Sequence, residues 1–113
     1  MNKAYTLTVA NETFAVDSTK VLQDGNATIE PNTFNIWPTA VSALTITKGT
    51  EKPNVVNMYA VRFTAAIDNC PIVFEGFALN WLGSEPSFMA GVTYEINIID
   101  NIAIWAEITL TAL

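Results

Sequence analysis

The sequence predicts an all-β fold, which we expect to be an antiparallel β-sandwich or small barrel of about eight to ten strands. Apolar and polar residues alternate along most of the chain, which is the pattern of strands that bury one face. Turn-forming residues separate these runs, and no helical pattern of about ten or more residues occurs. The length of 113 residues suits a single domain.

The first half of the chain is expected to form short strands. These strands cover residues 5–10, 13–16, 27–29, 33–37 and 41–47. Asn11-Glu12 predicts a turn that joins the first two strands into a hairpin, and Pro38 ends the fourth strand. Short strands with frequent turns are typical of all-β domains.

The polar segment 48–53 is the best candidate for a linker inside the chain. We expect residues 1–113 to form one β domain. Two arrangements remain open at this stage: residues 1–48 either complete the same sheet or form an N-terminal sub-sheet beside residues 54–113.

The second half is expected to contain longer strands. These strands cover residues 55–64, 72–74, 76–83, 93–99 and 102–110. Asp100-Asn101 joins the last two strands, and both residue types tolerate a positive φ, so a two-residue hairpin is predicted. That turn fixes the register, with Ile96 opposite Trp105 and an inner face of Tyr94, Ile96, Ile98, Ala103 and Trp105.

The other face of this hairpin carries apolar side chains that need to be covered. Ile99, Ile102, Ile104 and Ala106 share it, and the chain continues into an apolar end with Ile108, Leu110 and Leu113. Burying one isoleucine is worth about 2 kcal/mol. These seven residues are therefore the candidate interface to other copies or partners.

The charge balance excludes several classes of partner. Five Lys and Arg stand against eleven Asp and Glu, which gives a net charge of −6, and the cations are scattered. Nucleic acids and anionic membranes are bound by clustered cations, so neither is expected as a partner. Charged residues make up only 14% of the chain, which favours a surface that faces other protein. A monomer coated with Thr and Asn is the alternative.

The residue types argue against an enzyme, a metal site or a cofactor. The chain has no histidine, which excludes Ser-His-Asp triads and the usual zinc sites. The carboxylates Glu95 and Glu107 fall on opposite faces of the hairpin and so do not form a catalytic pair. Asp24-Gly25-Asn26 is a turn rather than a calcium loop. Cys70, the only cysteine, is expected to be a buried thiol.

The aromatic residues suggest one alternative function. Flat aromatic rings bind sugar rings, and Trp37 beside Pro38 is expected to be the most exposed tryptophan, hence the candidate glycan contact. Trp81 and Trp105 alternate with other apolar residues and are expected to lie in the core.

Residues 55–107 resemble a module of tailed-phage virion proteins. The resemblance lies in the strand Tyr59-Ala60-Val61-Arg62-Phe63-Thr64, the pair Asn80-Trp81, and the segment 94–105, which begins Tyr94-Glu95-Ile96 and ends in Trp105. The sequence departs from the pattern in two places: Asn80 replaces a lysine, and the usual loop rich in Thr, Gly and Ala is here Ala65-Ala66-Ile67-Asp68-Asn69-Cys70.

The resemblance implies a non-enzymatic structural part of a virion, such as a head fibre, a capsid decoration or a tail component. It implies a homo-oligomer, a trimer or higher, with other virion proteins as partners. A receptor- or glycan-binding module of a phage fibre is the alternative. The chain starts without the apolar run of a signal peptide, so we expect synthesis in the host cytoplasm.

Overall fold

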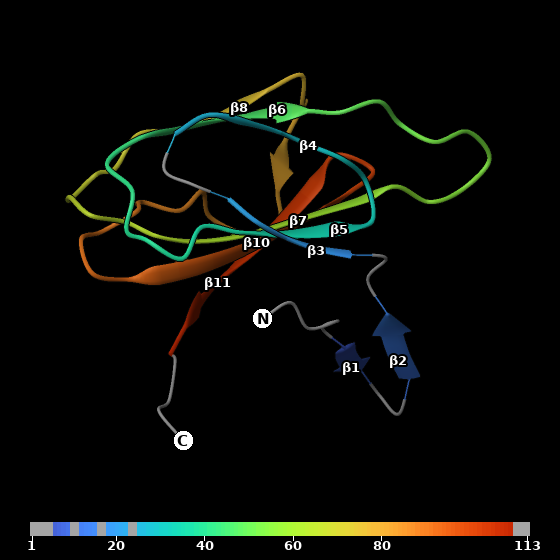
Figure 1. Ribbon diagram of the computed structural model, residues 1–113, viewed down its shortest axis with the longest axis horizontal. Helices are drawn as coiled ribbons and strands as arrows, with labels where there is room; N and C mark the ends of the chain where they lie inside the picture. Colours follow the sequence, from blue (N-terminus) through green and yellow to red (C-terminus); the bar gives the residue numbers. More distant parts are fainter. Residues whose placement is uncertain (1–5, 10–11, 16–17, 23–24, 110–113) are drawn as a thin grey trace.

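The computed structural model describes residues 6–9, 12–15, 18–22 and 25–109, and they form an all-β fold without helices (Figure 1). The strands are β1 (Thr6–Val9), β2 (Glu12–Ala15), β3 (Ser18–Val21), β4 (Ala27–Ile29), β5 (Thr33–Ile36), β6 (Leu44–Lys48), β7 (Met58–Thr64), β8 (Ile72–Glu75), β9 (Asn80–Trp81), β10 (Thr93–Ile99) and β11 (Ile102–Ile108). The predicted fold class is confirmed at this level.

The described strands form three sheets. The largest has the order β3-β5-β7-β10-β11-β9, a second has the order β4-β6-β8, and β1 pairs with β2 alone. The β1–β2 pair is the predicted opening hairpin. In Figure 1 the three-stranded sheet lies above the six-stranded sheet as a second layer.

The prediction that all strands run antiparallel is wrong. Of the eight pairings between described strands, β1–β2, β7–β10 and β10–β11 are antiparallel, and the other five are parallel. From β3 to β8 the chain crosses from one sheet to the other after every strand. Strands that are neighbours in one sheet are therefore two apart in sequence and run in the same direction.

This crossing also bears on the domain organisation. Strands from residues 18–48 pair with strands from residues 58–75 in both larger sheets, through β5–β7 and β6–β8. Strand pairing thus joins the two segments. Among the described strands of residues 1–48, only β1 and β2 lie in a sheet that contains no strand from the second half of the chain.

The core lies between the two larger sheets. Ile29 and Ile46 of the three-stranded sheet are completely buried, as are Phe63 and Ile96 of the six-stranded sheet. Tyr59, Val61 and Phe63 alternate with half-buried or smaller residues along β7, as the period of two predicts. Cys70 is buried, as predicted, and its Sγ lies 3.3 Å from the Val41 carbonyl oxygen.

The β10–β11 hairpin has the predicted register. Ile96 pairs with Trp105 and Ile98 with Ala103. Asp100 and Asn101 adopt φ values of 50° and 66°, which is the left-handed pair that a two-residue turn between twisted strands requires. β7 pairs with the other side of β10, so β10 is a central strand.

Several predicted strands differ in extent from the observed ones. The predicted strand 76–83 is reduced to the two residues of β9, because only these pair with β11, and Gly76 adopts a φ of 82°. β3 was not predicted, since its four residues alternate too briefly to stand out. Leu110, Leu113, Asn11 and Asp24 lie outside the described residues. The described residues also contain no helix able to span a membrane.

Candidate interaction face

One side of the six-stranded sheet turns away from the three-stranded sheet, and we call it the outer face. On β7, β10 and β11 it consists of the even-numbered residues of β7 and β11 and the odd-numbered residues of β10, because directly paired residues point to the same side. Arg62, Glu95 and Ala106 form one row across the three strands. The predicted interface residues from Ile99 to Ile108 all fall on this face.

Three isoleucines form the apolar part of the outer face. Ile99, Ile102 and Ile104 expose 41%, 47% and 49% of their surface. Ile99 pairs directly with Ile102, and Ile104 is the next residue on the same side of β11. Ala106 is exposed and Ile108 is half-buried at the end of β11. The hairpin register therefore places the predicted isoleucines together.

On the β5 side of the outer face, apolar side chains are buried. Phe34 and Ala60 are paired residues and both are buried, with Ile36 and Met58 packed against them. No local sequence pattern predicts this cluster, because it depends on the parallel pairing of β5 with β7. The outer face thus carries apolar side chains at both sides, and they are buried on β5 and β7 but about half exposed on β11.

An ion pair lies beside these two apolar parts, which meet where Met58 pairs with Ile99. The Arg62 guanidinium donates to Glu95 Oε2 through Nη2 at 2.8 Å and through Nε at 3.1 Å. The two side chains are only 23% and 13% exposed. The Arg62 guanidinium also lies 5.1 Å from the centre of the Phe34 ring, a distance typical of a cation–π contact. The pair neutralises both charges on this face.

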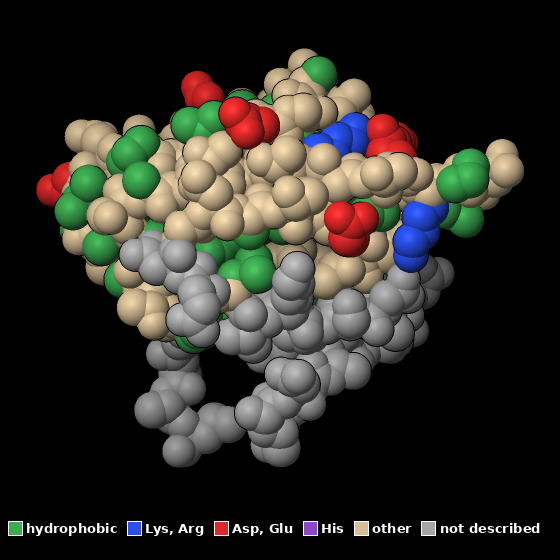
Figure 2. Space-filling view, turned by 45° about the horizontal axis from the view of Figure 1, so that its top comes forward, with side chains coloured by type: hydrophobic (Ala, Val, Ile, Leu, Met, Phe, Trp, Pro, Cys, Tyr) green, Lys and Arg blue, Asp and Glu red, His purple; other side chains and the backbone are tan. Residues whose placement is uncertain are grey.

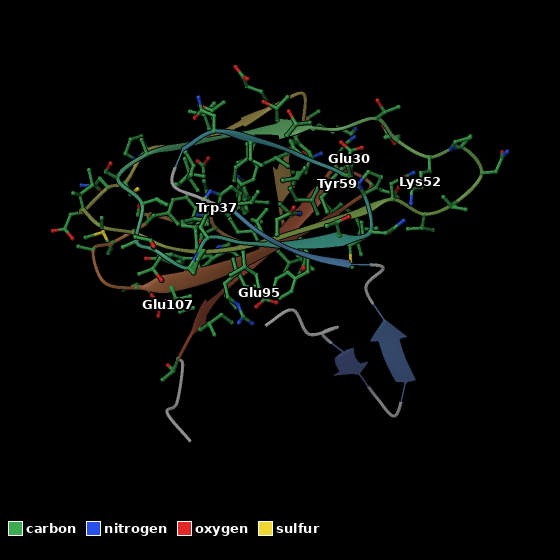
Figure 3. The ribbon with its side chains drawn as sticks, in the orientation of Figure 1. Glu30, Trp37, Lys52, Tyr59, Glu95 and Glu107 are labelled. Atoms are coloured by element: carbon green, nitrogen blue, oxygen red, sulfur yellow. The ribbon has the colours of Figure 1, made fainter. Side chains whose placement is uncertain are left out.

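Trp37 is buried, so the expectation that it is the exposed tryptophan is wrong. It exposes 2% of its surface, and Figure 3 shows it between the two layers. Its backbone nitrogen continues the β5–β7 ladder by donating to the Arg62 carbonyl at 2.9 Å, which turns the side chain inward. A ring that is buried between two sheets does not reach an external sugar. Trp81 and Trp105 are partly buried against the core.

Glu95 and Glu107 lie on opposite faces of the hairpin. Glu95 is held by Arg62 on the outer face, whereas Glu107 pairs with Tyr94 on the other side of the hairpin, as predicted (Figure 3). The described residues contain no cluster of three or more acidic or cysteine side chains that could bind a metal ion. On the side shown in Figure 2, basic side chains form no patch.

Among the described residues, Tyr59 is the one group whose acidity clearly changes. Burial raises the pKa of its hydroxyl above the ordinary value, Lys48 opposes this change, and the carboxylates of Glu51 and Glu30 add to it. The hydroxyl donates to the Gly49 carbonyl at 3.3 Å. Tyr59 is therefore a structural residue at the edge of the core, not a group prepared for proton transfer near neutral pH.

These features define an all-β protein whose widest sheet has a partly exposed apolar outer face. Comparison with known proteins finds no matching protein-family model, no matching curated protein and no matching solved structure. Function is therefore inferred from the residues of the chain itself.

Proposed function

We propose that the chain is a non-enzymatic structural protein of a tailed-phage virion, in the head fibre, capsid decoration or tail, that assembles through its outer face. Its partners are further copies, three or more in a closed ring, or other virion proteins. The resemblance of residues 55–107 to virion modules supports the assignment to a virion. The low content of charged residues, 14%, supports assembly independently.

The exposure of the three outer isoleucines carries this proposal. Burying a whole isoleucine is worth about 2 kcal/mol, so covering the exposed half of each contributes about 1 kcal/mol. Ile99, Ile102 and Ile104 together therefore offer about 3 kcal/mol for each copy that is covered. Scattered apolar residues are common on protein surfaces, but three adjacent ones on one sheet face indicate a contact.

The architecture that suits this role is a β-sandwich of the two larger sheets. Its support is the core between them, to which both sheets contribute fully buried side chains such as Ile46 and Ile96. A rigid two-layer domain would present the outer face without rearrangement. Within the part of the chain that the structure describes, β3, β4 and β8 each have one side without a partner strand, and these sides offer further places for contact between strands.

Ile104→Asp tests the proposal with a matched control, Ile67→Asp. Ile67 is exposed to 47%, similar to Ile104, but belongs to the loop after β7. A buried carboxylate at position 104 should weaken self-association at least about 30-fold, whereas the control should leave it unchanged. Light scattering and native mass spectrometry measure the oligomer, and circular dichroism verifies folding.

Two results would contradict the proposal. One is a wild-type chain that stays monomeric at all accessible concentrations and binds no virion protein. The other is an oligomer that dissociates equally in Ile67→Asp and Ile104→Asp, because the contact would then not involve the outer face.

A further inference from the structure

A groove opens on the inner side of the six-stranded sheet, and apolar side chains line it while polar groups make up most of its exposed surface. Its volume is about 480 Å³, and its walls are formed by Ile72, Phe74, Phe77, Leu79, Trp81 and Phe88. Polar groups occur at its rim, where Asn69, Glu85 and Ser87 are exposed. The rings meet edge to face, with centroids 5.9 Å apart for Phe74 and Phe77 and 6.3 Å for Phe74 and Trp81.

The groove exists because the two sheets differ in width. The six-stranded sheet has three strands more than the sheet that covers it. Residues 82–92, which follow β9 and form no strand, cover part of the remaining inner surface, where Phe88 contacts Phe63 and Tyr94 at centroid distances of 5.2 and 4.8 Å. β8 is the edge of the narrower sheet, and the groove lies between this edge and these residues.

The backbone of β8 is unpaired on the side that faces away from β6. β6 is its only partner strand among the described residues. Leu44 donates to the Pro71 carbonyl at 3.0 Å, so residue 71 and, by the alternation of a strand, residues 73 and 75 face β6. The N–H and C=O groups of Ile72 and Phe74 therefore point to the free edge. Their side chains line the groove.

The charges around the groove indicate which kind of peptide segment would bind there. Glu85 is the only charged residue that lines the groove, and Glu75 is exposed at the end of β8. No lysine or arginine is among the lining residues. The whole chain has a net charge of −6. A partner strand with basic residues would match both the local and the overall charge.

We propose that the β8 edge and the groove bind an extended peptide segment of another protein, in which apolar residues alternate with lysine or arginine. The segment pairs with the backbone of Ile72 and Phe74 as a fourth strand of the narrower sheet. Its apolar side chains enter the groove, and its basic side chains lie near Glu75 and Glu85. Strand addition of this kind derives affinity from the backbone and specificity from the alternate side chains. The outer face takes no part in it.

The probe is the synthetic peptide acetyl-Lys-Val-Lys-Phe-Lys-Val-Lys-Val-amide, tested on the full chain. We expect a dissociation constant of roughly 10–100 µM, in the range of small transient interfaces. Amide exchange measured by NMR should slow at Ile72 and Phe74, because their N–H groups become paired. A peptide in which Pro replaces each Val has no N–H at those positions and should not bind.

Ser87→Trp fills the groove from its rim, and Ser84→Trp is the matched control. Both serines are exposed, and both have carbonyls that accept from aromatic side chains, Tyr94 and Trp105 respectively, but only Ser87 lines the groove. We expect Ser87→Trp to weaken peptide binding at least about tenfold and Ser84→Trp to leave it unchanged.

Charge reversal distinguishes a local interaction of the peptide with Glu85 from attraction by the overall negative charge of the chain. Glu85→Lys should weaken binding roughly 3- to 10-fold, whereas Glu107→Lys, which is exposed outside the groove, should change it less than about twofold.

The proposal is overturned if the alternating peptide does not bind, if it binds equally well to Ser87→Trp, or if the proline peptide competes with it. Slowed exchange at Ile72 and Phe74 that appears on raising the protein concentration alone would identify a second copy as the occupant instead. Protection of the groove by an oligosaccharide but not by the peptide would identify a glycan site. Either result would refute a peptide site, and neither would bear on assembly through the outer face.

Discussion

The Arg62–Glu95 pair provides a quantitative test of how the outer face is held together. Two opposite charges about 4 Å apart attract with about 4 kcal/mol at an effective dielectric constant near 20, and the loss of hydration cancels much of this. Exposed pairs contribute about 0–1 kcal/mol, and breaking a buried pair costs about 3–5 kcal/mol. Exposures of 23% and 13% place this pair between the two cases.

The change is a double-mutant cycle of Arg62→Met and Glu95→Gln. Arg62→Met leaves Glu95 without its partner and removes the contact with Phe34, so we expect a loss of about 2–3 kcal/mol. Glu95→Gln retains a hydrogen-bond acceptor and should cost about 1 kcal/mol. The double variant should cost only about 2 kcal/mol, because no charge remains, which gives a coupling of about 1–2 kcal/mol.

Urea unfolding followed by tryptophan fluorescence measures all four proteins, at a concentration where the monomer dominates. The coupling should persist in high salt, since both groups are mostly shielded from solvent. A coupling below about 0.3 kcal/mol would refute the reasoning, because it would show that the pair behaves as if it were fully solvated.

Three further outcomes follow from the backbone and from Tyr59. Gly49→Ala should cost about 1–3 kcal/mol in urea unfolding, since the added Cβ would lie 2.6 Å from the Ile29 carbonyl oxygen and would also contact the Glu30 carboxylate; an unchanged midpoint would contradict this. Asn101→Gly should be neutral or stabilising by about 0.5 kcal/mol, whereas Asn101→Val should cost about 1–2 kcal/mol, because the φ of 66° is strained for a β-branched residue. Folding raises the pKa of Tyr59, so the unfolded chain loses the hydroxyl proton at a lower pH than the folded chain does. The contribution of this group to the free energy of unfolding is therefore fully present below pH about 10 and is lost as the pH rises through the folded pKa. Tyr59→Phe should remove this part of the pH dependence of the free energy of unfolding.

The sequence predicted the parts of the fold that local rules determine. The β10–β11 hairpin is one example, because a two-residue turn fixes the register and the register places Ile99, Ile102 and Ile104 on one face. The buried face of β7 is another, since its period of two is sustained over seven residues. Both follow from residues that are close in sequence.

The crossing between sheets lies beyond such rules. Parallel pairing of β5 with β7 joins residues about 26 positions apart, and nothing in either segment indicates its partner. Trp37 shows the consequence: Pro38 correctly indicated the end of a strand, but burial depends on the opposite sheet. The groove was missed for the same reason, because it arises from the difference in width between two sheets rather than from a motif.

The outer face and the groove lie on opposite sides of the β10–β11 hairpin, which makes their functions separable. Ile104 points away from the core, whereas Ser87 lies beside the groove and its carbonyl accepts from the Tyr94 hydroxyl on the inner side. Ile104→Asp should therefore weaken self-association at least about 30-fold and leave peptide binding within about twofold, whereas Ser87→Trp should weaken peptide binding at least about tenfold and leave self-association unchanged. If either substitution changed both properties, the two surfaces would be coupled, and a single contact covering an edge of the molecule would explain the data better. A chain with two independent contacts could join its own copies through one face and attach a different protein at the other.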